Sequence, residues 1–441
     1  MIKKVFIGIL SILVFSCQKV VNTDNGTNPI NKELPKLTTS SVVNISSTTA
    51  TSGGTIISNG NDSITAKGIC WATTPLPTLA NFNKLDTGNS LTFTISIQGL
   101  TKNITYYVRA YATNSIGTTY GNQISFRTDS TEHVYVTGTL NGRCVYWKDG
   151  VLYPLTNSGT FNYALGKSII VSNNDVYVAG YEYDGNNPFI QAKIWKNGIG
   201  VPLASLHSSA NAIEIASNDV YVVGEENYSS NSYAAKLWKN GVATTLSTSG
   251  TNAHASSIFI TENDIYVSGY EESGVNKAGI IWKNGIPTRL FGFCYPGGNG
   301  LCTYDATDIT DIYVVNNNVY AIGTSIIGTG IYDSILWKNG VATRINILPS
   351  SIFVNNNDVY IAGKVGNNAC IWKNGIITYL TNGTNQAFAT SVYVLGNDVY
   401  VTGFERLAGS INEIARVWKN GIAFNLSDGT GSAEPNDIFV Q

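Results

Sequence analysis

A sequence unit that recurs seven times in the last two-thirds of the chain constrains the fold more than any other feature. Each copy contains a segment close to Asp-Val-Tyr-Val-x-Gly, such as residues 175–180, and then a segment close to Trp-Lys-Asn-Gly, such as residues 195–198. The spacing of the copies is roughly 44 residues. The repeated tryptophans are Trp147, Trp195, Trp238, Trp282, Trp337, Trp372 and Trp418. One supersecondary unit is therefore expected per repeat.

The repeat length fits one four-stranded blade of a β-propeller and is too long for a leucine-rich or hexapeptide solenoid. Asn-Gly between two alternating segments indicates a tight hairpin, because both turn positions need a positive φ. A second tight turn joins segments like Ser351–Val354 to the Val-Tyr-Val strand that follows. We therefore predict an all-β seven-bladed β-propeller of four-stranded blades over residues 133–441.

The order of strands along the chain indicates how the propeller closes. The repeat region begins with a second strand at Val134 and ends with an inner strand at residues 437–441. The C-terminal strand should then complete the first blade and leave no exposed sheet edges there.

The repeated motif itself is predicted to be scaffold. One Trp per blade at a fixed strand position is best explained by packing between blades. The following lysines, such as Lys148, Lys196 and Lys239, are expected to face water and keep the outer edges soluble.

Composition excludes one class of partner. The formal net charge is −2, and no basic run or basic stripe interleaved with aromatics is present. Nucleic acid is therefore not expected as a partner.

The N-terminus carries an export signal. Lys3 and Lys4 precede an apolar stretch from Val5 to Phe15, which is too short for a membrane-spanning helix, and Ser16-Cys17 follows. This pattern resembles a bacterial lipoprotein signal, which implies that residues 1–17 form a signal peptide with a lipidated Cys17 that becomes the new N-terminus; plain secretion is the alternative. Acyl chains on Cys17 would anchor the protein to a membrane. Residues 18–35 are polar and rich in Asn, and are predicted to form a flexible tether.

Residues 36–128 form a separate predicted domain of alternating strands. The stretch from Leu100 to Thr128 resembles the last third of a fibronectin type III domain, with Leu100, Ile104 and Tyr106 at its corner positions and Ile in place of the usual Thr. The resemblance implies a β-sandwich in which Tyr106 bonds back to the backbone and Trp71 is buried. It implies no catalytic residue.

Two of the remaining cysteines are close in sequence. A Pro-Gly-Gly turn between Cys294 and Cys302 could bring them together, so a disulfide is one interpretation in an oxidising compartment. Metal binding is less favoured because no His or acidic cluster accompanies them. We expect no metal and no cofactor, and we expect Cys70, Cys144 and Cys370 to be buried apolar residues.

The candidate binding residues lie in loops. The two tight turns of each blade lie on one face of the disc, so the longer and more variable connections lie on the other, where binding usually occurs. Tyrosines with acids and amides between them suit contact with a glycan or a protein. The candidate rim comprises Tyr181, Glu182, Tyr183, Tyr228, Tyr233, Tyr270, Glu271, Tyr295 and Tyr304.

The whole architecture resembles exported lipoproteins of Gram-negative bacteria that carry propeller repeats, which implies the outer membrane, facing the periplasm or the outside. The leading hypothesis is a non-catalytic binding protein for a protein or carbohydrate partner. One alternative is a polysaccharide hydrolase or lyase that uses recurring loop carboxylates such as Glu182 and Glu271. Another is a structural or adhesion protein.

Overall fold

The computed structural model describes residues 31–129, 131–156, 163–183, 189–229, 232–247, 251–273, 276–293, 295–296, 302–303, 307–327 and 331–441. These residues form strands, turns and bends, so this part of the chain is all-β, as predicted. It contains no helix long and apolar enough to cross a membrane. The predicted signal sequence, Cys17, Cys294 and Tyr304 lie outside the described residues.

Residues 31–129 form the N-terminal unit, which consists of two antiparallel sheets. One sheet has the order β1 (Lys36–Thr39), β2 (Ala50–Ser58) and β5 (Thr92–Ile97). The other has the order β4 (Phe82–Leu85), β3 (Ala66–Ala72), β6 (Thr105–Thr113) and β7 (Thr118–Tyr120), and β8 (Ile124–Arg127) also pairs with β6. Both sheets contribute to one apolar core, which contains Trp71, Ile95 and Val108. Trp71 is therefore buried, as predicted.

The corner before β6 has the expected hydrogen bond. The backbone N–H of Thr101 donates to the Tyr106 hydroxyl oxygen at 3.0 Å. The Tyr106 ring is buried and stacks on Phe126, and Leu100 is buried beside it. This bond fixes the entry of the chain into the longest strand of its sheet.

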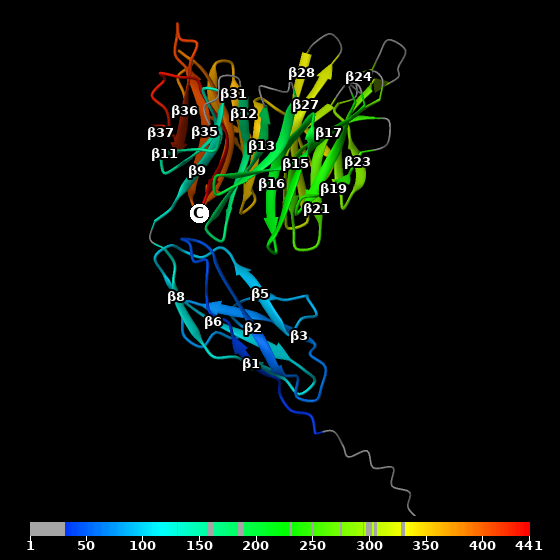
Figure 1. Cartoon of the computed structure of the whole chain (residues 1–441), viewed down its shortest axis with the longest axis vertical. Helices are drawn as coiled ribbons and strands as arrows, with labels where there is room; N and C mark the ends of the chain where they lie inside the picture. The colour runs from blue at the N-terminus through cyan, green and yellow to red at the C-terminus, as the bar shows by residue number, and fades with distance from the viewer. Residues whose placement is uncertain are drawn as a thin grey trace, which may run out of the picture.

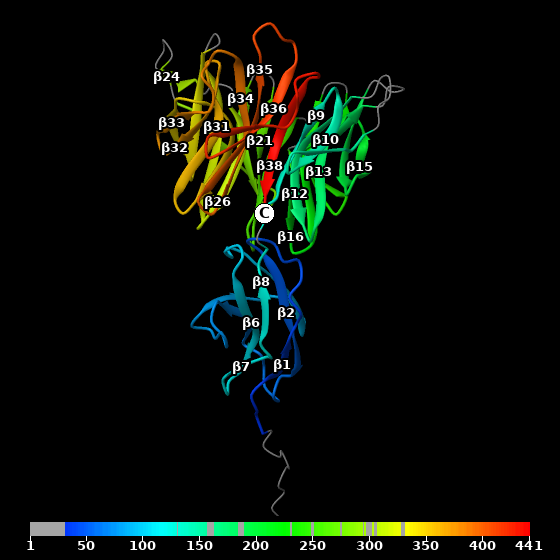
Figure 2. The same cartoon turned by 90° about the vertical axis from the view of Figure 1, so that its left-hand side faces the viewer.

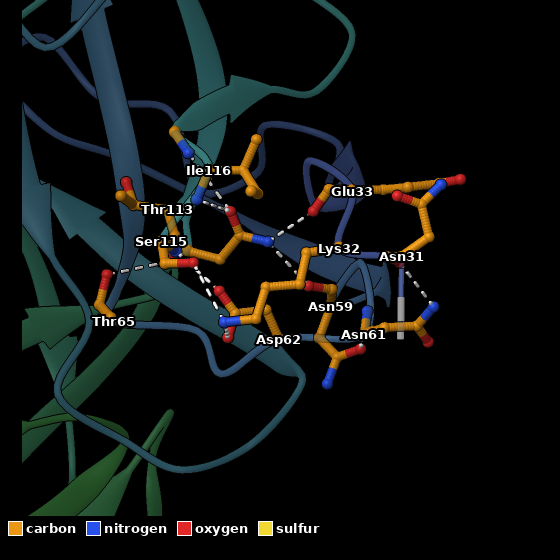
Figure 3. A network of polar contacts seen from close by, with 12 residues as sticks. Asn31, Lys32, Glu33, Asn59, Asn61, Asp62, Thr65, Thr113, Ser115 and Ile116 are labelled. Atoms are coloured by element: carbon orange, nitrogen blue, oxygen red, sulfur yellow. Dashed lines mark hydrogen bonds and ion pairs between the residues drawn. The ribbon is translucent and has the colours of Figure 1, made fainter. Parts of the chain in front are cut away.

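The described end of the predicted tether is attached to the N-terminal unit (Figure 3). The Lys32 ammonium group bonds the Asp62 carboxylate at 2.9 Å, and the side-chain amide of Asn114 donates to the Glu33 carbonyl at 2.6 Å. The hydrogen bond from Lys32 is the main reason that the pKa of Asp62 lies below its usual range. Residues 31–33 thus belong structurally to the N-terminal unit.

Residues 132–441 form the ring unit, whose described part contains seven four-stranded sheets. The innermost strands are β38 (Ala433–Val440), β12 (Tyr163–Ser172), β16 (Ser208–Ala216), β20 (Asn252–Ile260), β26 (Thr307–Val315), β30 (Leu348–Asn355) and β34 (Gln386–Leu395). The second strands are β9 (Val134–Leu140), β13 (Asp175–Tyr183), β17 (Asp219–Ser229), β21 (Ile265–Ser273), β27 (Asn318–Ile327), β31 (Asp358–Val365) and β35 (Asp398–Arg406).

The two outer positions are filled by shorter strands. The third strands carry the repeated Trp and are β10 (Arg143–Lys148), β14 (Ile190–Lys196), β18 (Ser232–Lys239), β22 (Asn276–Lys283), β28 (Ile331–Lys338), β32 (Asn368–Lys373) and β36 (Glu413–Lys419). The outermost are β11 (Val151–Pro154), β15 (Ile199–Leu206), β19 (Val242–Thr245), β23 (Ile286–Leu290), β29 (Val341–Ile345), β33 (Ile376–Tyr379) and β37 (Ile422–Asn425). A small pair, β24 (Tyr295–Pro296) and β25 (Cys302–Thr303), lies apart from these sheets.

The innermost strands form a closed circle. Each contacts the innermost strand of the next sheet, and the circle closes where β38 lies between β34 and β12. The C-terminal strand β38 pairs with β9, so the first sheet combines one C-terminal and three N-terminal strands. Figures 1 and 2 show the sheets arranged around a common axis, with the red C-terminal strand beside the cyan β9.

The repeated turns have the predicted geometry. Asn197 and Gly198 have φ values of 49° and 87°, which the hairpin between β14 and β15 requires. The Asn197 side chain also accepts a hydrogen bond from the Val176 amide at 2.9 Å and donates one to Asp175 at 2.6 Å. The turn residue therefore also fixes the start of the neighbouring strand β13.

The repeated lysine is not simply solvent-facing, as the sequence suggested. Lys196 forms an ion pair with Asp175 at 2.7 Å and lies 5.1 Å from the ring centre of Tyr177. The same arrangement recurs in four more sheets, at Lys239, Lys283, Lys373 and Lys419. The cause is strand pairing, which places the Lys opposite the Tyr of the Asp-x-Tyr segment.

The repeated Trp packs between adjacent sheets, as predicted. Trp195 is 2 % exposed and belongs to a core cluster with Tyr135 and Cys144 of the first sheet and Ile169 of its own. The other six are between 0 and 9 % exposed. The repeat motif therefore holds the ring together.

The N-terminal unit lies against the face of the ring that carries the tight turns (Figures 1 and 2). Asn44 bonds Asn173 of a turn at 2.6 Å, and Lys84 pairs with Glu262 at 3.3 Å. At the joint, the Glu132 carboxylate bonds Lys102 of the N-terminal unit at 2.6 Å, Lys419 of the ring at 3.0 Å, and the Tyr400 hydroxyl. Burial alone would raise the pKa of Glu132, but these three bonds lower it to about 2.

Candidate functional site

The seven innermost strands line a central channel, and each has a β-bulge at the same step. The bulged residues are Lys167, Asn211, Ser256, Thr310, Ser350, Thr390 and Asn436. A bulge leaves one residue outside the ladder and re-aims its side chain. The bulges therefore divide the channel into a half toward the turn face and a half toward the face with the longer connections, which we call the long-loop face.

In six of the seven strands, the side chain of the residue after the bulge forms a hydrogen bond to a neighbouring sheet. Asp437 accepts bonds from the Ser168 hydroxyl at 3.0 Å and the Ser391 hydroxyl at 2.8 Å, one from each adjacent sheet. Asp311 accepts bonds from the Ser257 hydroxyl at 2.6 Å and the Ile352 amide at 2.8 Å. Burial raises the pKa of Asp311 to about 6 and also raises that of Asp437. These carboxylates serve the closure of the ring.

On the long-loop side of the bulges, a polar network crosses three sheets. The Asn211 side chain accepts a bond from the Lys167 ammonium group at 2.9 Å and donates to Glu225 at 2.6 Å. Glu225 in turn lies 3.7 Å from Nδ1 of His254. Burial lowers the pKa of Lys167, which the nearby Glu225 opposes. The network places a cation, an amide, an acid and an imidazole in one row.

Three of the predicted rim tyrosines surround this network, which together with them we call the mouth cluster. Tyr270 stacks on His254 with ring centres 4.7 Å apart, and Tyr233 lies 5.4 Å from the same ring. Lys167 lies over Tyr181 at 5.7 Å. Burial, with nearby Tyr163 and Glu225, raises the pKa of Tyr181 to about 12, and burial and Asp308 raise that of Tyr270. Half-buried rings and hydrogen-bonding groups thus meet at one end of the channel.

The remaining rim residues with described side chains are Glu182, Tyr183 and Glu271. Glu182 pairs with Lys193, and Glu271 is 7 % exposed. Tyr183 pairs across β13 and β14 with Ile190. The side chains of Tyr228, Tyr295 and Cys302 and the whole of Tyr304 and Cys294 lie outside the description, so the predicted disulfide stays a prediction.

Three of the four recurring glutamates that the hydrolase alternative would use are held in ion pairs. Glu182, Glu226 and Glu405 pair with Lys193, Lys236 and Arg416, which all lie on the adjacent third strand. Each glutamate lies two positions after the strand-ending Gly, and its cationic partner lies opposite that Gly on the third strand.

The described cysteines behave as apolar residues. Cys70, Cys144 and Cys370 are free and buried, and burial raises the pKa of each thiol, to about 11 for Cys70 and about 12 for Cys370. Within the described ranges, no group of three or more His, Cys, Asp and Glu side chains could hold a metal ion.

Sequence reasoning missed four members of the mouth cluster, Lys167, Asn211, Glu225 and His254. They lie on the inner strands or on the strand beside them. The repeated motif contains only residues that the copies share, and these four differ between copies. A comparison of the repeats position by position would have shown Lys167 and Asn211 at the bulged position, where four of the other five copies have Ser or Thr.

Comparisons with known proteins give structural likeness only. No protein family matches the sequence, and no curated protein does. A quinoprotein alcohol dehydrogenase-like protein from Bacteroides thetaiotaomicron is 11 % identical over 92 % of this chain and 98 % of its own, with a TM-score of 0.37. An acylaminoacyl peptidase from Pyrococcus horikoshii is 11 % identical over 74 % of this chain and 51 % of its own, with a TM-score of 0.39. An exo-1,5-α-L-arabinanase from a bovine ruminal metagenomic library is 8 % identical over 64 % and 99 %, with a TM-score of 0.31.

Proposed function

We propose that this chain is a lipid-anchored cell-envelope protein that binds a glycan, without catalysis, through the long-loop face of a seven-bladed β-propeller. Its N-terminal unit is proposed to be a fibronectin type III-like sandwich that holds the propeller away from the membrane. Support for the domain assignments comes from the closed circle of seven four-stranded sheets and from the bond between Thr101 and Tyr106. Lipidation of Cys17 and location at the outer membrane of a Gram-negative bacterium belong to the same proposal.

The observation that carries the binding function is the mouth cluster. Tyr181 and Tyr270 offer ring surfaces on which a sugar can stack, and Lys167, Asn211 and Glu225 offer donors and acceptors between them. A few convergent polar groups among aromatic side chains at a channel mouth are typical of small-molecule and glycan sites. A protein partner would need a wider apolar contact surface. The test must therefore distinguish binding of a glycan from binding of a protein.

The proposal of binding without catalysis is supported by the ion pairs of three of the four recurring glutamates. A hydrolase needs one carboxyl group poised as an acid and one as a base or nucleophile. Glu182, Glu226 and Glu405 instead each face a Lys or Arg on the next strand.

A glycan array and a cell-envelope pull-down with the full chain in detergent test the proposal. Tyr181→Ala and Tyr270→Ala should each weaken glycan binding by roughly tenfold, the loss of one stacking ring. Tyr379→Ala is the control, because Tyr379 is 54 % exposed on the outermost strand β33. Equal binding by all three variants would contradict the site. Capture of a protein that depends on the same tyrosines would replace the glycan by a protein partner.

A further inference from the structure

A chamber of about 1170 Å³ lies between the turn-side half of the channel and the N-terminal unit. Its walls are the innermost strands from the bulges to the tight turns, and its floor is formed by residues 44–51 and 96–102 of the N-terminal unit. This volume slightly exceeds that of most small-ligand pockets. The chamber extends from the bulges toward the turn face. Lys167 and Asn211 of the mouth cluster line it at the bulges, whereas the cluster's three tyrosines are not part of its lining.

Five aromatic side chains line the chamber, among many polar residues. Phe259, Tyr313, Phe353, Tyr393 and Phe439 come from five successive innermost strands, and neighbouring ring centres are 4.6, 4.9, 5.0 and 5.4 Å apart. The residues on either side of them along each strand, such as Ile312 and Val314, are buried between the sheets. Because side chains alternate along a strand, the five rings point into the channel.

The sixth and seventh places in this circle are filled by Ile170 and Glu214. Glu214 therefore puts a carboxyl group where the other sheets have an aromatic or aliphatic side chain. It is enclosed by protein, but keeps accessible surface because it faces the chamber. Among the described residues, no Lys, Arg or His forms an ion pair with it. Burial raises the pKa of Glu214 to about 8. The hydrogen bond from the Ile215 amide opposes this rise, and the nearby Asp437 adds to it.

The other charged groups around the chamber already have ion-pair or hydrogen-bond partners within the protein. Glu132 is paired with Lys102 and Lys419, and Asp398 with Lys419. Asp311 and Asp437 accept the hydrogen bonds that join the sheets. Lys167, on the bulge ring, bonds Asn211 and lies close to Glu225. Glu214 is the carboxyl group left for a ligand.

We propose that the chamber binds an organic ammonium ion, whose charge pairs with Glu214 and whose alkyl groups contact the aromatic rings. Aromatic faces attract cations that are weakly hydrated, and a buried carboxylate requires a positive partner. A Ca²⁺ or Mg²⁺ ion would need several oxygen ligands, whereas the five rings near Glu214 supply only the phenol oxygens of Tyr313 and Tyr393. The ammonium group could belong to a free amine or to a lysine side chain of a peptide.

Titration calorimetry on the full chain in detergent tests this with choline and its uncharged isostere 3,3-dimethylbutan-1-ol. Choline should bind at least about tenfold more tightly than the isostere. Near pH 7 its binding should release close to one proton, because the raised pKa keeps Glu214 mostly protonated until a cation arrives. A third titration with Nα-acetyl-lysine N-methylamide separates a peptide-borne amine from a free one, and binding of either amine supports the proposal.

Two variants locate the site. Glu214→Gln keeps the shape, removes the ionisable group, and should abolish both the preference for choline over the isostere and the proton release. Glu33→Gln is the matched control, since Glu33 is exposed on the far side of the N-terminal unit. Tyr393→Leu should weaken the binding of choline by roughly fivefold, because one aromatic ring is lost. Equal affinity for choline and its isostere, an unchanged Glu214→Gln variant, or no binding at millimolar probe would each overturn the proposal. Both variants leave Tyr181 and Tyr270 of the mouth cluster unchanged, so failure of this proposal and failure of the glycan proposal can be told apart.

Discussion

Asp437 accepts a hydrogen bond from the hydroxyl group of Ser168 at 3.0 Å, although the two residues are 269 positions apart in the chain. The same carboxylate accepts the Ile169 amide at 3.0 Å and the Ser391 hydroxyl at 2.8 Å. One side chain of the last strand therefore joins the sheets on both sides of it. Closure of the ring has a polar component at the channel in addition to the pairing of β38 with β9.

The substitution Asp437→Ala should destabilise the ring strongly. It leaves the donors of Ser168, Ile169 and Ser391 without their acceptor in a buried place, with a cost of about 3 kcal/mol or more. Urea unfolding measures the loss. Asp437→Asn keeps one acceptor oxygen and should lie between the wild type and Asp437→Ala. Asp428→Ala, in an exposed turn, is the control and should change stability far less. Equal stability of Asp437→Ala and Asp428→Ala would contradict the role of Asp437.

Deletion of residues 436–441 tests closure by the whole strand. The deletion removes most of β38, so β9 becomes a free edge and the core around Val136 and Ile438 opens. We expect a lower unfolding midpoint and light scattering that increases with protein concentration, because an unpaired edge recruits other chains. Gln441→Ala serves as the control. An unchanged midpoint in the deletion would show that β38 does not close the ring.

The scaffold could be predicted from sequence because its signals are local and repeated. Asn197-Gly198 specifies a hairpin through φ values that few other pairs adopt, and the Trp recurs at the same distance before each such turn. The ion pair between Lys196 and Asp175 was missed because it depends on the register of two strands, which the turn sets but the sequence does not display. Repetition predicts that a contact recurs, but not which contact it is.

The channel could not be predicted in the same way. Burial, with Tyr313 and Glu214 nearby, raises the pKa of Tyr393. Glu214 and Tyr393 are single residues in strands of two different repeats. Only the closed ring brings these positions together. The docking of the N-terminal unit on the turn face likewise depends on single contacts such as that of Asn44 with Asn173. No periodic signal accompanies either feature, so both appear only with the three-dimensional arrangement.

One sheet departs from the repeated pattern in two places at once, which gives a further test. In the first sheet His133 replaces the Asp found in five of the other six copies, and Asp149 replaces the Asn of the turn; the two side chains are 2.6 Å apart. Asp149 still accepts the Val134 amide at 2.9 Å, as Asn197 accepts that of Val176. The two replacements thus exchange the acid between partners and keep the contact.

His133→Asp alone should destabilise the first sheet, because it places two carboxylates in contact. His133→Asp with Asp149→Asn should restore the pair found in the other sheets. Since both side chains are partly exposed, a double-mutant cycle should give a favourable coupling of only about 0.5–1 kcal/mol. Unfolding by urea measures all four proteins. A coupling of zero would show that the two changes are independent.

The raised pKa of Glu214 predicts how stability depends on pH. The folded protein holds this proton up to about pH 8, whereas an unfolded Glu loses it near its model value of 4.5. The folded state therefore binds more protons between these values, and the stability that protonation contributes is complete below about pH 4.5 and is lost as pH rises through 8.

Relative to Glu214→Gln, the wild type should lose on the order of 3 kcal/mol from pH 5 to pH 9. The other titratable groups around Glu214 are Asp437, Tyr313, Tyr393 and Lys167, and all are present in both proteins, so the difference isolates Glu214. Urea unfolding of the two proteins at each pH gives this difference. A wild type that gained stability relative to Glu214→Gln as pH rose would show that Glu214 is ionised in the folded state at neutral pH, and that a cation already in the channel or a solvent path compensates its charge.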